Sequence, residues 1–265
     1  MATLAEIANG IRDFLRLRSL PVAIKFLEKA EDLNKIQKIR RPDHLMSWCQ
    51  VVGIARNMGW TMGITVDDLV TPACAFKLGF GFVPPESKTM YAGIWVKTKE
   101  DSIKYVDTLP HLPFGKFQAA AVGPISGERI ESPDLAYIFG TPAQMNLLLN
   151  GLQYDGYERL HFYFSGEGSC SDAFVEAYLS GKPQLTVPCL GERCMGLVQE
   201  DELEIAMPIN LLQKALDGMN ALRASRTIGY PIPFFGYQAD IFPLISRTYP
   251  NIDKMMEQVK KQSKK

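Results

Sequence analysis

The chain has 265 residues, of which 46% are hydrophobic and 22% are charged. This length is sufficient for one large domain with a well-buried core, and the composition excludes a disordered chain. Lysine plus arginine and aspartate plus glutamate both number 29, so the net charge is zero. A neutral chain has no general attraction to nucleic acid or to an anionic membrane, and we expect neither as a partner.

The apolar runs of the sequence, such as residues 135–139, are much shorter than the about 20 residues that a membrane span needs. The first residues lack a basic stretch followed by an apolar one, so no secretory signal is expected. The basic run at residues 260–265 is typical of a solvated tail. We therefore expect a cytoplasmic protein, and its oligomeric state stays open.

The first half of the chain contains predicted helices and one predicted strand. Apolar residues at helical spacing predict helices over residues 5–17, 44–58 and 99–109, and alternation predicts a strand over residues 22–27. Residues 28–42 are charged and indicate a surface connection. Prolines and glycines at residues 71–85 favour a loop around Cys74.

The second half adds most of the predicted strands. Core strands are expected over residues 117–122 and 135–139, an aromatic strand over 160–164, and short strands over 184–187 and 204–207. Thr141 and Pro142 suit the N-cap and first position of a helix that runs to residue 152. Further helices are expected over residues 173–179, 208–219 and 241–258.

This order of elements lacks a regular β-α-β alternation. It predicts an α+β or irregular α/β fold, with a mixed sheet surrounded by helices. No linker and no internal repeat is visible in the sequence. We therefore expect a single compact domain over residues 1–240, followed by a C-terminal helix and basic tail over residues 241–265.

Five cysteines pose the main functional question. In a reducing compartment disulfides are disfavoured, which leaves buried core thiols, metal ligands or a reactive nucleophile. No C-x2-C spacing occurs, so the usual signature of zinc ribbons and ferredoxin-type clusters is absent. Cys189 and Cys194 form a C-x4-C pair in a turn-like segment, while Cys49, Cys74 and Cys170 can meet only through the fold.

A glycine-containing segment runs from Gly166 to Asp172, between a predicted strand and a predicted helix. Gly166 and Gly168 permit a sharp turn, and Ser169 can cap the helix while free amides face an anion or a cluster sulfur. Cys170 lies at the same helix N-terminus, where a thiol binds metal more readily. A tight turn with a purely structural cap is the alternative.

Arg193 lies between the two late cysteines, in a segment that also contains Gly191. Its planar guanidinium suits a carboxylate or a phosphate, although such an arginine is more often a surface or structural residue. The three histidines are scattered along the chain and form no zinc or catalytic-triad pattern.

Several short segments occur in a fixed order along the chain: Trp48-Cys49-Gln50, Thr71-Pro72-Ala73-Cys74 with Gly79-Phe80-Gly81, Phe139-Gly140-Thr141-Pro142-Ala143-Gln144, Gly166-Glu167-Gly168-Ser169-Cys170, Gly191-Glu192-Arg193 and Tyr230-Pro231-Ile232-Pro233. This ordered set resembles the uncharacterised ArCR family, domain of unknown function 169, of anaerobic archaea and bacteria. The resemblance implies that Cys49, Cys74 and Cys170 belong to the family pattern, and Cys189 and Cys194 less firmly. It implies no settled activity.

Three dispersed thiolates in a protein of anaerobes suit a [4Fe–4S] cluster with one open iron for Lewis-acid or sulfur chemistry. The leading hypothesis is therefore an oxygen-sensitive iron–sulfur protein of anaerobic metabolism. Its metal ligands would be Cys49, Cys74, Cys170 and Cys189, with Cys194 as an alternative fourth ligand. In this hypothesis the cluster-binding loop contains Gly166, Gly168 and Ser169, and Arg193 orients a small anionic substrate. If the protein is an enzyme, a lyase, a dehydratase or a desulfurising enzyme is expected.

Two other hypotheses remain open. The first is a metal-free module for small-molecule binding or regulation, with buried structural cysteines and a pocket lined by aromatic residues: Phe162, Phe164, Tyr230, Phe234 and Phe235. The second is a structural zinc ion bound by four of the five thiols, which would unfold the protein when a chelator removes it.

Overall fold

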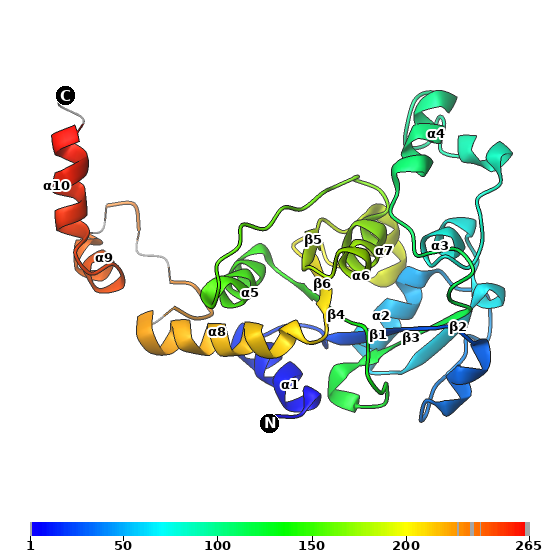
Figure 1. Ribbon diagram of the computed structural model, residues 1–265, viewed down its shortest axis with the longest axis horizontal. Coiled ribbons are helices and arrows are strands. Elements are labelled where there is room, and N and C mark those ends of the chain that lie inside the picture. The colour runs from blue at the N-terminus through cyan, green and yellow to red at the C-terminus, as the bar shows by residue number, and fades with distance from the viewer. Residues whose placement is uncertain (1, 227, 234–235, 239, 263–265) are drawn as a thin grey trace.

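The computed structural model describes residues 2–226, 228–233, 236–238 and 240–262. At its centre is a six-stranded sheet with the order β2-β3-β1-β4-β6-β5, in which every neighbouring pair is antiparallel (Figure 1). The strands are β1 (Val22–Leu27), β2 (Met62–Thr65), β3 (Ala119–Pro124), β4 (Leu135–Gly140), β5 (Gln184–Thr186) and β6 (Leu203–Pro208). The predicted α+β class is confirmed, although the sheet is antiparallel and not mixed.

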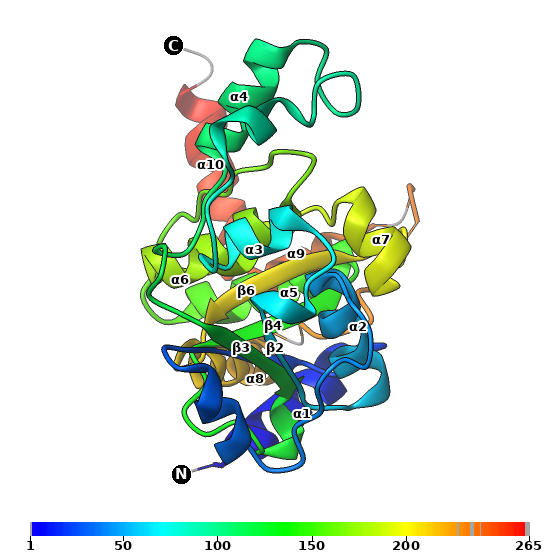
Figure 2. The same cartoon turned by 90° about the vertical axis from the view of Figure 1, so that its right-hand side faces the viewer.

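Helices cover both faces of this sheet (Figure 2). Residues of one face, such as Ala23 and Ala136, pack against α1 (Leu4–Leu15), α5 (Pro142–Tyr154) and α8 (Leu211–Arg226). Residues of the other face, such as Ile24 and Tyr137, pack against α2 (Trp48–Met58), the π-helical turn η5 (Ser171–Val175) and α6 (Glu176–Ser180). Because successive strand residues point to opposite faces, each strand contributes to both cores.

Three of these helices begin at a reciprocal cap. A Ser or Thr side chain accepts a hydrogen bond from the third helical residue, whose side chain bonds back to the backbone of the cap: Thr3 with Glu6, Ser47 with Gln50, and Thr141 with Gln144. The expected start at Thr141 and Pro142 is therefore confirmed. The cap at Ser47 starts α2 at Trp48, four residues later than expected.

Short elements account for most of the differences from prediction. The expected loop at residues 71–85 contains α3 (Pro72–Lys77) and the start of η3 (Pro85–Thr89), and the expected turn after Cys189 is α7 (Leu190–Gly196). The surface connection contains the 3-10 helix η1 (Ala30–Lys35), and two more 3-10 turns are η2 (Val66–Asp68) and η4 (Ile125–Gly127). One or two helical turns are too short to show a clear periodicity.

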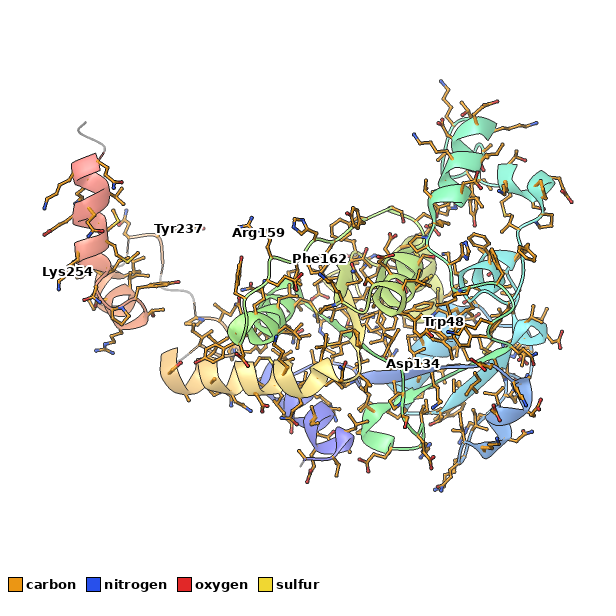
Figure 3. The ribbon with its side chains drawn as sticks, in the orientation of Figure 1. Trp48, Asp134, Arg159, Phe162, Tyr237 and Lys254 are labelled. Carbon is orange, nitrogen blue, oxygen red and sulfur yellow. The ribbon has the colours of Figure 1, made fainter. Side chains whose placement is uncertain are left out.

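The aromatic strand expected at residues 160–164 is absent, since these residues form no strand and Tyr163 and Phe164 are exposed. Figure 3 shows Arg159 and Phe162 on this extended segment, which crosses above α5. An alternating apolar pattern forms a strand only where a sheet edge is free to pair with it. Helix α8 starts later than the predicted residue 208 because β6 continues to Pro208, and it ends at Arg226, seven residues after the predicted end at 219.

The remaining helices lie outside the two layers. Helix α4 (Lys99–Thr108), which was predicted, projects with η3 from one end of the molecule (Figure 1). The single terminal helix predicted over residues 241–258 is in fact two helices, α9 (Phe242–Thr248) and α10 (Ile252–Gln262), which lie away from the sheet. In the described part of the chain, no helix is both long enough and apolar enough to cross a bilayer.

Candidate functional site

Four of the five cysteines are buried on one side of the sheet. Cys49 lies in the first turn of α2, Cys74 in α3, Cys170 directly before η5, and Cys189 at the N-cap of α7. Burial raises the pKa of the Cys49 thiol well above its ordinary value, and Glu192 and the other three buried thiols raise it further. The four thiols therefore lie within electrostatic reach of one another. Cys194, in contrast, is exposed on α7.

Glycines let α2 and α7 approach closely enough to bring two of these thiols together. A Cβ atom at Gly53 would lie 2.8 Å from the carbonyl oxygen of Gly196, and one at Gly196 would lie 2.9 Å from that of Cys49. A Cβ atom at Gly191 would lie 3.6 Å from Sγ of Cys189 and 3.8 Å from Sγ of Cys49. The sulfur atoms of Cys49 and Cys189 therefore both lie next to the position that a side chain at residue 191 would occupy.

The Cys74 sulfur accepts two hydrogen bonds. The Thr71 hydroxyl donates to Sγ at 2.9 Å, and the backbone N–H of Trp48 donates to it at 3.5 Å. The second bond connects α3 to the start of α2, next to Cys49. Two donors on one sulfur suit the electron-rich thiolate of a metal ligand.

Lys77 is a buried lysine with a sulfur atom as its hydrogen-bond partner. Its Nζ atom lies 3.3 Å from Sγ of Cys170. None of the ion pairs among the described residues involves Lys77. Burial is the largest single influence and lowers the pKa of Lys77, but Cys170, Cys74, Tyr105 and Cys189 together raise it, so that it lies well above its ordinary value. The site thus contains one buried lysine beside its thiols.

Lys77 opposes the effect of burial on the pKa of the Cys170 thiol. Burial raises the pKa of the Cys170 thiol well above its ordinary value, while Lys77 acts to lower it. A metal that replaces the thiol proton would leave an ammonium next to a thiolate, which is a favourable pair in a medium of low dielectric constant.

The glycine-containing segment lies directly over Lys77. Gly168 has a φ of +84°, and a Cβ atom there would lie 3.2 Å from Nζ of Lys77 and 3.1 Å from the hydroxyl of Tyr105. Gly166 also has a positive φ, but it is exposed and has no atom within 4 Å of a Cβ position. Of the two glycines predicted for the site, only Gly168 therefore borders it.

The helix that follows does not have the predicted side-chain cap. Backbone N–H groups of Ser171 and Asp172 donate to the carbonyl of Gly168, so the N–H groups of Ser169 and Cys170 precede the first bonds within the helix. The Asp172 carboxylate instead accepts from the backbone and hydroxyl of Ser165, at 2.9 and 2.7 Å.

A buried network of hydroxyl and carboxyl groups lies beside the thiols. The Tyr137 hydroxyl lies 3.0 Å from Oε1 of Glu192 and 2.5 Å from Oε2 of Glu204. The Ser169 hydroxyl donates to the other oxygen of Glu192 and accepts from the backbone N–H of Cys189 at 2.9 Å. Burial raises the pKa of Glu204 well above its ordinary value, and Glu192 raises it further.

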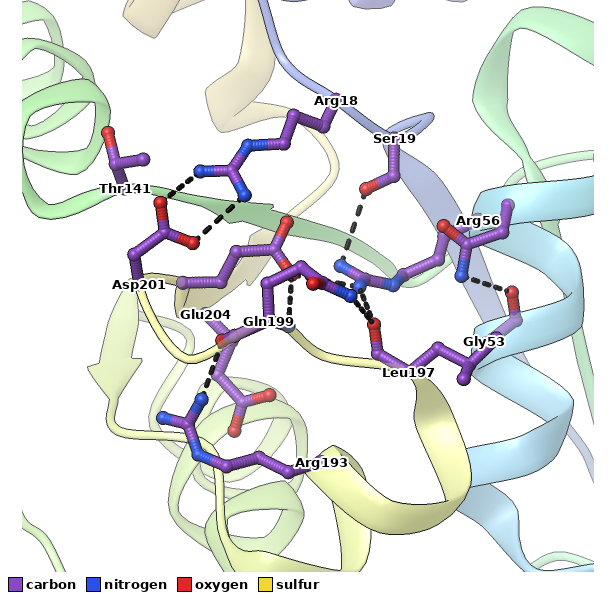
Figure 4. Close-up of polar contacts among 12 residues, drawn as sticks. Arg18, Ser19, Gly53, Arg56, Thr141, Arg193, Leu197, Gln199, Asp201 and Glu204 are labelled. Carbon is purple, nitrogen blue, oxygen red and sulfur yellow. Dashed lines mark hydrogen bonds and ion pairs between the residues drawn. The ribbon is translucent and has the colours of Figure 1, made fainter.

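Arg193 lies near these groups, but its guanidinium bonds to a backbone carbonyl. Its Nη1 atom donates to the carbonyl of Gln199 at 2.6 Å (Figure 4). Arg56 on α2 donates to the Leu197 carbonyl at 3.0 Å and forms a buried ion pair with Glu202 at 2.9 Å. These contacts hold the chain after α7 against α2.

The aromatic residues proposed for a pocket do not gather in one place. Phe162 and Tyr230 pack against the core formed by α1, α5 and α8. Phe164 is 57% exposed and, with Tyr163 and Asp172, lines a cavity of about 290 Å³. Phe234 and Phe235 lie outside the described residues.

The arrangement of the donor atoms bears on which group the site could hold. Zinc–sulfur bonds of about 2.3 Å would bring four sulfurs into close contact around one point. Among the described residues, no group of three or more histidine, cysteine, aspartate or glutamate side chains has the spacing that holds one ion. Two residues next to site cysteines also have buried polar atoms without a hydrogen-bond partner, namely Trp48 at Nε1 and Ser171 at Oγ. These two unpartnered donors would suit a bound group that accepts hydrogen bonds.

Sequence comparison with known proteins gives a family without an assigned activity. The sequence pattern of the family described as "Uncharacterised ArCR" matches residues 10–218. The chain is also similar to a protein of Methanocaldococcus jannaschii named "Uncharacterized protein MJ0308", with 24% identity over 230 residues that cover 85% of this chain and 97% of the relative. No solved structure matches the chain.

Proposed function

The chain belongs to the uncharacterised ArCR family, and from that premise we propose that it is an oxygen-sensitive iron–sulfur protein of anaerobic metabolism. Cys49, Cys74, Cys170 and Cys189 would hold a [4Fe–4S] cluster. The observation that carries the proposal is the burial of these four thiols from four separate segments within electrostatic reach of one another, three of them also within reach of the buried Lys77.

The charge of the site supports a polynuclear centre. Four thiolates are unfavourable in a protein interior unless positive charge offsets them. Iron supplies most of that charge, and Lys77, at 3.3 Å from the Cys170 sulfur, supplies one more unit.

Hydrogen-bond donors around the sulfurs support the same assignment. Thr71 and the backbone of Trp48 donate to Cys74, and the N–H groups of Ser169 and Cys170 have no acceptor within the following helix. Hydrogen bonds to cluster sulfurs are one means by which proteins adjust reduction potential.

A bound cluster supplies electron transfer when all its irons have protein ligands, or Lewis acidity at an open iron when one cysteine does not bind. Cys189 is the ligand whose absence would open such a position. If a small anionic substrate binds there, Lys77 is better placed to attract it than Arg193, whose guanidinium is bonded to the Gln199 carbonyl. We infer a cytoplasmic location, because all five thiols are free.

The test is a paired substitution on protein purified without oxygen and reconstituted with iron and sulfide. Cys74→Ser removes a proposed ligand, and Cys194→Ser removes the exposed cysteine. We expect Cys74→Ser to lose most of its iron and acid-labile sulfide and Cys194→Ser to retain both. Full retention by Cys74→Ser would reject this ligand set, and stoichiometric zinc in place of iron would favour the structural-zinc hypothesis.

A metal-free, ligand-binding function is the second candidate, and the cavity beside Phe164 favours it. Its volume of about 290 Å³ and its lining of Tyr163, Phe164 and Asp172 suit a small molecule that combines an apolar part with a polar group. Protein that stays colourless and metal-free after reconstitution, and that a small molecule stabilises against heat in a screen, would support this candidate.

A further inference from the structure

The buried network of Tyr137, Glu192 and Glu204 contains too few hydrogens if both carboxyl groups are ionised. A phenol has one hydrogen to donate, and the Tyr137 oxygen lies within hydrogen-bond distance of both carboxyl groups. At least one of these two contacts therefore requires a hydrogen from a carboxylic acid. The trio holds a second proton in addition to that of the phenol.

The surroundings of the two carboxyl groups decide which of them carries this proton. Glu192 has a hydroxyl donor at each of its oxygens, Tyr137 at Oε1 and Ser169 at Oε2. Glu204 is fully buried, and among the described residues no N–H or O–H donor bonds to its Oε1 atom. An ionised carboxylate with one bare oxygen in a protein interior is far more costly than a neutral acid. The proton therefore belongs on Glu204.

The charged and titratable groups around Glu204 do not change this assignment. Glu192 on α7 raises the pKa of Glu204 through its charge and through a direct hydrogen bond between the two carboxyl groups, and Cys189 at the N-cap of α7 raises it further. Tyr137 on β4 lowers it less than burial raises it. On the same segment of chain, Glu202 is paired with Arg56. Lys77, the buried cation of the site, bonds instead to Cys170.

The site also lacks a histidine that could act as an acid. His44 and His161 are exposed, and His111 packs against the ring of Phe114 at 4.1 Å, on the side of the molecule where α4 projects. A reaction at the four thiols that needs a proton would therefore draw it from the Lys77 ammonium, from a thiol or from the carboxyl network, and of these the carboxyl network is the one made of oxygen acids.

We propose that Glu204 is the internal acid of this site, a neutral carboxylic acid at neutral pH that supplies its proton through Tyr137 to Glu192. In the transfer, the O–H bond of Glu204 breaks and its proton moves to the phenol oxygen. The phenol proton moves at the same time to Glu192, so that Glu204 becomes the carboxylate and Glu192 the acid. The phenol is unchanged, no electrons are transferred, and the charge of the trio stays at −1.

Of the three residues in this network, Glu192 lies nearest to the thiols, both in the sequence and through its hydrogen bonds. It bonds to Ser169, which bonds to the backbone of Cys189, and among charged neighbours it has the largest effect on the pKa of Cys49. Delivery of the proton to a reactant at the thiols depends on the proposed function, whereas the protonated state of Glu204 does not.

Infrared spectroscopy of the full-length protein as purified tests the proposal. At pH 8 surface carboxyl groups are ionised, so a carbonyl band of a carboxylic acid reports a buried one. We expect this band in the wild type, its loss in Glu204→Gln, and its retention in Glu200→Gln, which changes an exposed glutamate. In Tyr137→Phe the band should persist and shift, because the acid loses its acceptor.

Three results would overturn the proposal: no acid band in the folded wild type, a band that survives Glu204→Gln, or a band that Tyr137→Phe leaves unshifted. Loss of the band in Glu192→Gln with retention in Glu204→Gln would assign the proton to Glu192. Circular dichroism on each variant confirms that the protein is folded. Iron content does not enter this measurement, so its outcome is separate from that of the iron–sulfur proposal.

Discussion

The Nζ atom of Lys77 lies 3.3 Å from the Sγ atom of Cys170, and both residues are buried. A lysine with this degree of burial is rare unless a negative group offsets its charge. In this protein the hydrogen-bond partner of the lysine is a sulfur atom, and the carboxyl groups of Glu167 and Asp172 interact with it only at longer range. The pair therefore connects the electrostatics of the site to the state of its thiols.

Replacing this lysine separates metal binding from folding. We expect Lys77→Met to bind less iron and sulfide, because the thiolates lose their positive neighbour. The metal-free variant should keep or raise its melting temperature, since an apolar side chain of similar size avoids the cost of burying a charge. Metal analysis and thermal unfolding of the metal-free protein measure both effects.

Lys88→Met is the matched control, because Lys88 forms an exposed ion pair with Asp107 far from the thiols. It should change neither the metal content nor the melting temperature appreciably. A Lys77→Met protein that binds a full complement of iron would show that this charge does not support the centre.

The buried ion pair between Arg56 and Glu202 should be essential for stability. Both side chains are only 2% exposed, and Arg56→Met would leave Glu202 charged and unpaired. We expect a loss of about 3–5 kcal/mol in the free energy of unfolding, measured by urea denaturation. The double variant Arg56→Met with Glu202→Gln should recover part of that loss. A loss in the single variant no larger than about 1 kcal/mol, the value for an exposed pair, would contradict this account.

The close approach of α2 and α7 predicts that alanine at Gly53 lowers stability and metal binding, whereas alanine at Gly81 does not. Gly53→Ala would place a Cβ atom 2.8 Å from the Gly196 carbonyl oxygen, so the two helices must move apart. We expect a destabilisation of about 1–3 kcal/mol together with lower metal binding, since Cys49 and Cys189 lie on these helices. Gly81→Ala, where a Cβ atom meets nothing within 4 Å, should leave stability and metal binding close to wild type. Equal stability of the two variants in urea would contradict the predicted contact.

The protonated Glu204 predicts a pH dependence of stability. Its pKa is raised in the folded protein, mainly by burial, so the folded state holds a proton that the unfolded state releases above about pH 4.5. Stability from this group is complete below that pH and falls as pH rises towards the folded-state pKa, by up to about 1.4 kcal/mol per pH unit. Urea denaturation of the wild type and Glu204→Gln at pH 5 and pH 8 should therefore show that the variant gains stability relative to the wild type at the higher pH. A difference between them that does not change with pH would contradict the assignment.

Elements with strong local signals were predicted from the sequence. The cap at Thr141 and Pro142 marks the start of α5, and the alternation after Pro21 marks β1. Elements that depend on a distant partner were not predictable. The alternating residues 160–164 have the same local pattern as a strand, but no sheet edge pairs with them. Helices α3 and α7 are too short to show periodicity.

For the candidate site, too, local sequence signals could be interpreted, whereas contacts between distant residues could not be predicted. The four cysteines proposed as ligands are the four that the fold buries on one face, but their spacing in sequence gave no indication that they would meet. The sequence analysis did not identify Lys77, although it follows Cys74 by three residues and so lies near it on a helix. Tyr137 and Glu204 lie on paired strands, and only the register of β4 with β6 places them on the same face.

The measurement that tests the central claim most directly is the iron and acid-labile sulfide content of the wild-type protein, purified and reconstituted without oxygen. The proposed centre predicts about four iron and four sulfide per chain, with a brown colour that air bleaches. A colourless protein with neither iron nor sulfide after reconstitution would contradict it, and the four buried cysteines would then be core thiols.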